Sequence, residues 1–220
     1  MGNLVFTGLF TEGTTDIRFL DSVVKKTLDS IAFDCSGQIE TELIEIKIDK
    51  TGLGFTDQVL RASEKAFDVY GISILFVHTD ADDNSDKIIF DTKINPTQKE
   101  IELLLGRTMI PIVPVYMTEA WMLADKDLLR DELGTSCSIG ELQLTKNPEE
   151  MTDPKQAIEN AIRISKENQT KRKRNQGLVI ADLYQIIGQK IELERLDKLP
   201  SYLKFKDNLK QAFRDLNFLH

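Results

Sequence analysis

The sequence predicts an α/β fold in which helices flank a mainly parallel central sheet, with a helical appendix at the C-terminus. Three segments rich in apolar and β-branched residues, 4–10, 72–79 and 109–117, have the composition of buried parallel strands. Segments with the 3.6-residue spacing of amphipathic helices lie between them. This alternation of strand and helix is typical of a parallel sheet assembled from βαβ units.

The first half of the chain supplies most of the predicted sheet. Glycine and polar residues separate its apolar runs, and Gly71 marks the end of one helix just before a strand. The expected elements are a strand at 3–10, a helix at about 14–31, a strand at 39–48, a helix at 55–70 and a strand at 72–77.

The second half changes from mixed to helical character. A helix at 96–105 precedes a predicted strand at 109–116, whose two prolines cannot donate ladder hydrogen bonds and so indicate an edge or irregular position. Another helix begins near Glu119. Later helices are expected at 155–168, 178–187, 191–197 and 201–216. We therefore expect an α/β core over 1–134 and a helical region over 135–220 that packs on it.

Acidic residues follow three of the predicted strands at the point where each strand ends. Glu12 comes directly after the first strand, Asp80 and Asp82 follow the apolar run before them, and Glu119 follows the strand that contains the two prolines. Ligands of open α/β sheets bind at the carboxyl ends of the strands, so these groups are expected at one edge. In an extended backbone, residues two apart point to the same side, which predicts a paired arrangement of Asp80 and Asp82.

Such a group of carboxylates favours a divalent cation. Two carboxylates about 4 Å apart repel by roughly 4 kcal/mol at an effective dielectric constant near 20, so a cation or protonation must compensate. Mg²⁺ or Mn²⁺ suits oxygen ligands of this kind. Asp16 and Asp83 also have ordinary explanations, as residues that stabilise a helix start or a turn. Glu12, Asp80 and Asp82 are therefore the predicted metal ligands.

Composition indicates a cytoplasmic protein that does not enter a membrane. The chain has 220 residues and a formal charge of −8, with neither a long apolar run nor a signal sequence at its start. The net charge disfavours coating of nucleic acid by bulk electrostatics. A local basic stretch is nevertheless a candidate contact with phosphates, or else a solvated surface. It consists of Arg163, Lys166, Lys171, Arg172, Lys173 and Arg174.

Three other side chains have both a functional and a structural interpretation. His78 stands two residues before Asp80, so it could contact phosphate or metal, although a core or supporting position is favoured. Lys155 could neutralise a phosphate oxygen or be an ordinary lysine in the first turn of a helix. Trp121, the only tryptophan, is expected in the core rather than stacked on a base.

The motifs resemble a known domain. The segment EGTTD at 12–16 and the Asp-Ala-Asp at 80–82, each after a strand, resemble the conserved Glu and Asp-x-Asp of the TOPRIM domain of topoisomerases, primases and nucleases. More narrowly, the chain resembles a family of small TOPRIM-like proteins often encoded beside ABC-type ATPases. That likeness rests on EAWMLAD at 119–125, Asn-Pro-Glu at 147–149 and Asp-Pro-Lys at 153–155.

The resemblance implies a TOPRIM/Rossmann-like fold and a nuclease that cleaves DNA or RNA in a prokaryotic antiviral defence system. Glu12, Asp80 and Asp82 would hold Mg²⁺ or Mn²⁺, and Glu119 would bind a second metal or act as a general base. The pattern departs at Asn84, where TOPRIM domains often have another acid. Asp83 or Glu119 could replace it, so one metal or two remain open.

The resemblance also implies an ABC-type ATPase as a partner protein. The chain contains no phosphate-binding loop of the Gly-x-x-x-x-Gly-Lys-Ser/Thr type, so ATP hydrolysis would belong to that partner. Two alternatives remain: a non-catalytic metal-binding or regulatory subunit of an ATPase complex, and a phosphohydrolase that acts on a nucleotide. Self-association as a homo-oligomer is also open.

Overall fold

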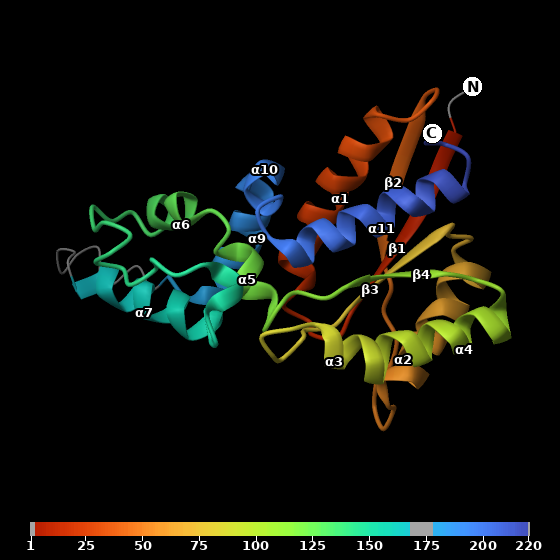
Figure 1. Ribbon diagram of the computed structural model, residues 1–220, viewed down its shortest axis with the longest axis horizontal. Helices are drawn as coiled ribbons and strands as arrows, with labels where there is room; N and C mark the ends of the chain where they lie inside the picture. The colour runs from red at the N-terminus through yellow and green to blue at the C-terminus, as the bar shows by residue number, and fades with distance from the viewer. Residues whose placement is uncertain (1–2, 168–177, 220) are drawn as a thin grey trace.

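The fold is α/β, with four parallel strands flanked by helices and further helices toward the C-terminus (Figure 1). The computed structural model describes residues 3–167 and 178–219. Neighbouring strands lie in the order β2-β1-β3-β4, and each pair is parallel. The strands are β1 (Asn3–Thr11), β2 (Ile39–Glu45), β3 (Ile74–His78) and β4 (Met109–Ile112). The predicted fold class is confirmed.

Helices connect all the strands and make up most of the rest of the described chain. Those before β4 are α1 (Ile17–Phe33), α2 (Phe55–Glu64), the π-helical turn η1 (Lys65–Val69), α3 (Lys87–Ile89), the π-helical turn η2 (Phe90–Ile94) and α4 (Asn95–Leu105). Those after β4 are α5 (Thr118–Met122), α6 (Lys126–Glu132), the 3₁₀ turn η3 (Pro148–Glu150), α7 (Pro154–Glu167), α9 (Ile180–Lys190), α10 (Leu193–Leu196) and α11 (Pro200–Asp215).

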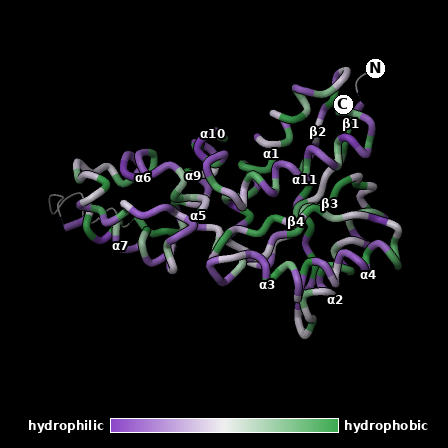
Figure 2. Tube along the Cα trace, in the orientation of Figure 1, coloured by the Kyte–Doolittle hydropathy of each residue, from purple (hydrophilic) through white to green (hydrophobic). Residues whose placement is uncertain are grey.

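The sheet has a hydrophobic core on each face. Successive side chains of a strand point to opposite faces, so Leu9 of β1 joins one core while Phe10 joins the other. Helices α1, α9 and α11 contribute to the first core, and α2 and α4 cover the opposite face (Figure 1). The hydropathy colouring shows apolar stretches along β3 and β4, between these helix layers (Figure 2).

Strand β4 occupies an edge of the sheet, as its prolines predict. Its ladder with β3 ends at Ile112, and single backbone bonds continue the contact beyond it. Ala81 N donates to Pro114 O at 3.0 Å, and Asp82 N donates to Tyr116 O at 2.9 Å. This irregular continuation holds the loop after β3 beside the segment that leads into α5.

The helical region is tied to the sheet by a buried network around Trp121. The indole is fully buried and packs edge-on against Tyr202, with ring centroids 5.3 Å apart, which confirms its predicted core position. Its Nε1 donates to Ser201 Oγ at 2.7 Å, and Ser201 Oγ donates to Glu149 Oε1 at 2.5 Å. The tryptophan of EAWMLAD and the glutamate of Asn-Pro-Glu therefore serve packing between α5, η3 and α11.

Helices α9 and α1 make an unusually close approach at Gly188. A Cβ atom at this position would lie 2.7 Å from Phe19 O, closer than real side chains come to a backbone oxygen. Only glycine therefore fits here without a shift of one of the two helices. Within the residues described, none of the helices is long and apolar enough to span a bilayer.

Candidate metal site at the carboxyl edge of the sheet

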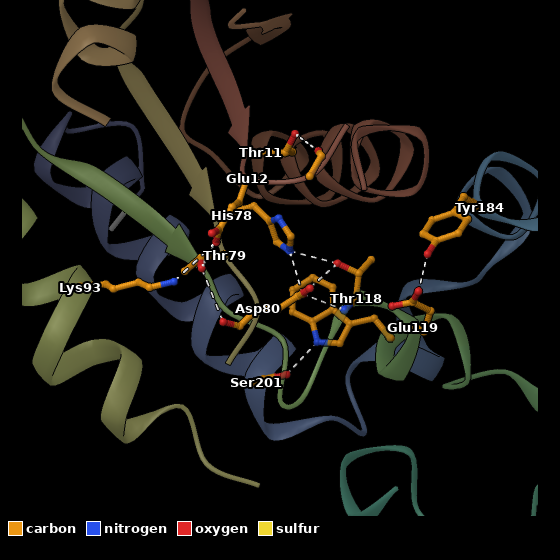
Figure 3. A network of polar contacts seen from close by, with 12 residues as sticks. Thr11, Glu12, His78, Thr79, Asp80, Lys93, Thr118, Glu119, Tyr184 and Ser201 are labelled. Carbon is orange, nitrogen blue, oxygen red and sulfur yellow. Dashed lines mark hydrogen bonds and ion pairs between the residues drawn. The ribbon is translucent and has the colours of Figure 1, made fainter. Parts of the chain in front are cut away.

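The predicted metal ligands follow two strands that are hydrogen-bonded neighbours. Thr11 and His78, the last residues of β1 and β3, are paired in register, and Glu12 N donates to His78 O at 3.2 Å. The Glu12 carboxylate turns toward β3, where its Oε2 accepts a hydrogen bond of 2.5 Å from Thr79 Oγ1 (Figure 3). Glu12 and Asp80 are thus brought to the same edge, as the strand pattern predicted.

Asp80 is held by donors from two different elements. Its Oδ1 accepts hydrogen bonds from Thr118 N at 2.9 Å and Thr118 Oγ1 at 3.3 Å, and it lies 3.2 Å from His78 Nε2 (Figure 3). Both partners are buried, whereas the Asp80 side chain is 29% exposed. The start of α5 therefore fixes the orientation of this carboxylate while leaving it accessible.

His78 is a buried side chain that contacts Asp80. Burial lowers the pKa of its imidazole, but the hydrogen bond and charge of Asp80, with the charges of Asp16 and Glu12, raise it above the ordinary value. Its Nε2 also lies 3.0 Å from Thr118 Oγ1. Among the described residues, its Nδ1 is the buried side-chain nitrogen or oxygen that lacks a hydrogen-bond partner. His78 is therefore a buried neighbour of Asp80, which agrees with the core position that the sequence favoured.

Asp82 reaches the site by a turn rather than by a strand. Strand β3 ends at His78, and Asp82 has a left-handed backbone with φ of 55°. The extended backbone assumed for the pair Asp80 and Asp82 is therefore wrong, because the chain bends to meet Tyr116. Burial raises the pKa of Asp82, the charges of Asp80 and Glu12 raise it further, and Lys93 opposes them. The three carboxylates are close enough to interact electrostatically.

Two more acids stand on the inner side of this group. Asp16 precedes α1 but makes no side-chain capping bond, and its Oδ2 lies where a Cβ on Gly13 would be only 2.1 Å away. Burial raises its pKa, as does the charge of Asp80, against the opposing effect of His78. Any stabilisation of the helix start by Asp16 is thus electrostatic and does not involve a capping hydrogen bond.

Glu119 is almost completely buried, with 4% of its surface exposed. Its Oε1 accepts a short hydrogen bond from the hydroxyl of Tyr184 on α9 (Figure 3). Burial raises the pKa of Glu119, and the charges of Asp80 and Asp16 add to that increase. The structure therefore brings Glu119 within electrostatic reach of the edge, and Tyr184 is a partner that sequence reasoning missed.

Two lysines that were not predicted approach Glu12. Lys50, in the loop after β2, donates from Nζ to Thr11 O at 2.6 Å and to Glu12 O at 2.8 Å. Lys93, in η2, places Nζ 3.7 Å from Glu12 Oε2 (Figure 3). The position of Lys50 after a strand was a usable signal, since such loops gather at this edge. The sequence around Lys93 gave no indication that its side chain points toward Glu12.

The remaining predicted residues have other surroundings. Asp83 Oδ1 accepts from Asn84 N at 2.7 Å, as expected for a turn, and Lys155 is exposed in the first turn of α7. Arg163 pairs with Glu167 at 2.6 Å, and Lys166 Nζ donates to Leu178 O at 2.8 Å. The other members of the basic stretch, Lys171, Arg172, Lys173 and Arg174, lie outside the described residues.

The carboxylates at this edge suit a cation that prefers oxygen ligands, although they are not arranged as a preformed metal site. Glu12, Asp80 and Asp82 offer carboxylate oxygens, the ligands that Mg²⁺ and Mn²⁺ prefer. Within residues 3–167 and 178–219, however, no three His, Cys, Asp or Glu side chains form a ready-made metal-binding group. Glu12 instead pairs with Lys93, so binding of a metal by all three carboxylates would require side-chain movement.

Comparison of the chain with family models, with curated proteins and with solved structures found no match. The geometry of the site indicates what chemistry it could perform. That geometry combines accessible carboxylates at the edge, a buried histidine and glutamate behind them, and two lysines on the flank.

Proposed function

We propose that this protein is a Mg²⁺-dependent nuclease that hydrolyses phosphodiester bonds of DNA or RNA. The observation that carries the proposal is the convergence of Glu12 and Asp80 at the ends of two paired strands, with Asp82 in electrostatic reach of both. Open α/β sheets bind ligands at this edge. The resemblance of the Glu and Asp-x-Asp motifs to TOPRIM domains supports the same reaction.

Each side chain has a role that follows from its surroundings. Glu12, Asp80 and Asp82 would hold the ion, and bound Mg²⁺ would supply positive charge to polarise the phosphodiester and to acidify a water molecule. Thr118 and His78 keep Asp80 oriented, which reduces the reorganisation needed for binding. Glu119 would act as the general base or bind a second metal, because it lies within electrostatic reach of Asp80 and burial raises its pKa.

The test is a cleavage assay with purified protein, Mg²⁺ or Mn²⁺, and single- and double-stranded DNA and RNA. We expect cleavage that EDTA abolishes, and that the substitutions Glu12→Gln and Asp80→Asn each reduce to background. Glu40→Gln, which changes an exposed acid on β2, is the matched control and should cleave normally. Unchanged cleavage by the double variant Glu12→Gln/Asp80→Asn would contradict the proposal.

The biological setting is also a proposal. We propose that the nuclease is an effector of a prokaryotic genome-defence system and works with an ABC-type ATPase, because the EAWMLAD segment resembles proteins encoded beside such ATPases. Co-expression of the two chains followed by affinity purification tests the association. Restriction of phage growth by the pair, lost with Asp80→Asn, tests the defence role.

A second candidate function is a non-catalytic metal-binding or regulatory subunit of an ATPase complex. The observation that favours it is the ion pair of Glu12 with Lys93 at 3.7 Å, while the described residues contain no preassembled set of three metal ligands. This candidate predicts stoichiometric co-purification with the ATPase and metal binding, but no cleavage of any polynucleotide or nucleotide.

A further inference from the structure

A lysine ammonium group interacts with two carboxylates of the candidate site, those of Glu12 and Asp82. Lys93 Nζ lies 3.7 Å from Glu12 Oε2, on the side of Glu12 that faces β3 (Figure 3). Its charge also opposes the rise in the pKa of Asp82 that neighbouring acids produce. Lys93 therefore interacts with two of the three predicted metal ligands, which follow different strands.

We infer that Lys93 is an exchangeable counter-ion of the metal site. Its ammonium group neutralises Glu12 in the metal-free protein, leaves when a divalent metal binds, and then contacts a phosphate oxygen of the substrate. The inference rests on the proposed function, because it takes Glu12, Asp80 and Asp82 as the metal ligands. It adds a competition between lysine and metal, and a substrate contact that the sequence motifs do not contain.

The geometry of the ion pair allows this exchange. A tight, charge-assisted hydrogen bond would be about 2.7–2.9 Å long, so the 3.7 Å separation is a loose contact. Both side chains remain accessible, with 30% of Lys93 and 47% of Glu12 exposed. An ion pair in such a position is weak and is readily replaced by a stronger ligand.

Lys50, at the same edge of the sheet, is held by hydrogen bonds and provides a comparison with Lys93. Its Nζ donates to two backbone carbonyls, Thr11 O at 2.6 Å and Glu12 O at 2.8 Å. Those contacts hold the loop after β2 against the end of β1, and Lys50 acts on the Glu12 carboxylate through its charge without a hydrogen bond to it. Lys50 is therefore fixed by backbone carbonyls, whereas the ion pair of Lys93 is with the carboxylate of a predicted metal ligand.

Lys93 would stay near the site after it leaves Glu12. Its Nζ lies 5.3 Å from the centre of the Phe55 ring, at the start of α2, which provides a cation–π contact that does not depend on Glu12. The lysine also belongs to η2, a π-helical turn of a type found often at functional sites. Released from Glu12, the ammonium group would remain beside the edge where a phosphate would bind.

The test separates metal affinity from cleavage. Mn²⁺ binding is measured by titration calorimetry or electron paramagnetic resonance for wild type, Lys93→Met and Lys93→Arg, with Lys99→Met on α4 as the matched control. We expect Lys93→Met to bind Mn²⁺ about fivefold more tightly, because an exposed competing ion pair is lost. Lys93→Arg and Lys99→Met should bind as wild type does.

At saturating Mn²⁺ the same Lys93→Met variant should cleave at least about tenfold more slowly, because a charged contact to the phosphate is lost. Opposite effects on affinity and rate would not arise from general damage to the fold. Mn²⁺ affinity that is unchanged or weaker in a folded Lys93→Met protein overturns the inference. Tighter binding without cleavage in any variant, wild type included, keeps the counter-ion role but overturns the nuclease and the phosphate contact.

Discussion

At the residue scale, Thr118 connects the groups on which the site depends. Its backbone N–H and hydroxyl both reach Asp80 Oδ1, and its hydroxyl also lies 3.0 Å from His78 Nε2. A single threonine at the start of α5 thus links the loop after β3 to the helical region. Because the hydroxyl is completely buried, water cannot replace it without a rearrangement.

Substitution of Thr118 by valine should weaken the site while preserving its shape. The variant keeps the backbone donor to Asp80 but loses the hydroxyl that orients Asp80 and His78. Loss of a partner that orients a metal ligand costs about 10–100-fold in metal affinity or activity, so we expect Mn²⁺ affinity to fall by about tenfold. Titration calorimetry measures the change.

Thr27→Val is the matched control, because Thr27 in α1 is equally buried and its hydroxyl lies 2.8 Å from the hydroxyl of Tyr202, which is not a group of the candidate site. It should lower stability without lowering Mn²⁺ affinity. Equal Mn²⁺ affinity in wild type and Thr118→Val would show that the threonine does not orient the ligand.

At the element scale, helix α9 completes the inner side of the site. It packs against α1 and carries Tyr184, whose hydroxyl donates to the buried Glu119. This hydrogen bond lowers the pKa of Glu119, but burial outweighs it and the net direction is upward. A raised folded pKa means that Glu119 contributes stability at low pH, which is lost as the pH rises through that pKa.

Tyr184→Phe should therefore destabilise the protein in a pH-dependent way. Loss of the donor leaves the Glu119 carboxylate without this partner and raises its pKa further, at a cost of about 1–3 kcal/mol when the group is ionised. Thermal melting should show a larger difference from wild type at pH 8 than at pH 4, where Glu119 is protonated in both proteins. The pH profile of cleavage should shift toward higher pH.

Tyr202→Phe offers the comparison, since the Tyr202 hydroxyl lies 2.8 Å from the neutral Thr27 Oγ1. It should lower the melting temperature by a similar amount at both pH values. A pH-independent difference for Tyr184→Phe would mean that the ionisation of Glu119 is not coupled to α9.

The apolar runs of the strands and the 3.6-residue spacing of the longer helices located these elements, because each pattern reflects which side chains of the element are buried. It also placed β4 at an edge, since Pro111 and Pro114 remove ladder donors. It missed the left-handed turn at Asp82, because that conformation depends on backbone bonds to a segment more than thirty residues away. The sequence could not predict the contacts of Lys93 and Tyr184 for the same reason, because tertiary packing determines them.

At the scale of the whole molecule, the site lies where the sheet meets the helical region. Glu12 and Asp80 come from the sheet, Thr118 and Glu119 from α5, and Tyr184 from α9. Helix α11 packs on β4, and the network of Trp121, Ser201 and Glu149 joins it to α5 and η3. The predicted division at residue 134 therefore separates segments that share one core and one site.

Gly188→Ala tests this dependence at a distance from the site. The added methyl group would meet Phe19 O at 2.7 Å, so α9 must move away from α1. Overpacking of this kind costs about 1–3 kcal/mol, and Tyr184, one helical turn earlier, moves with the helix. We expect a lower melting temperature and the same pH-dependent instability as in Tyr184→Phe.

Gly140→Ala is the comparison, because a Cβ there would meet only Ser138 Oγ at 3.9 Å. It should leave both the stability and its pH dependence unchanged. A Gly188→Ala protein as stable as wild type would show that α1 and α9 can separate without consequence.

The contact at Gly188 has a consequence for how this protein can change. The spacing between α1 and α9 depends on a hydrogen atom in place of a side chain at Gly188, and α9 carries the Tyr184 hydroxyl that donates to Glu119. Another helical region of similar size could replace this one only if its helix also placed a glycine against the backbone of Phe19 in α1. The α/β core and its helical region must therefore be engineered as a single unit.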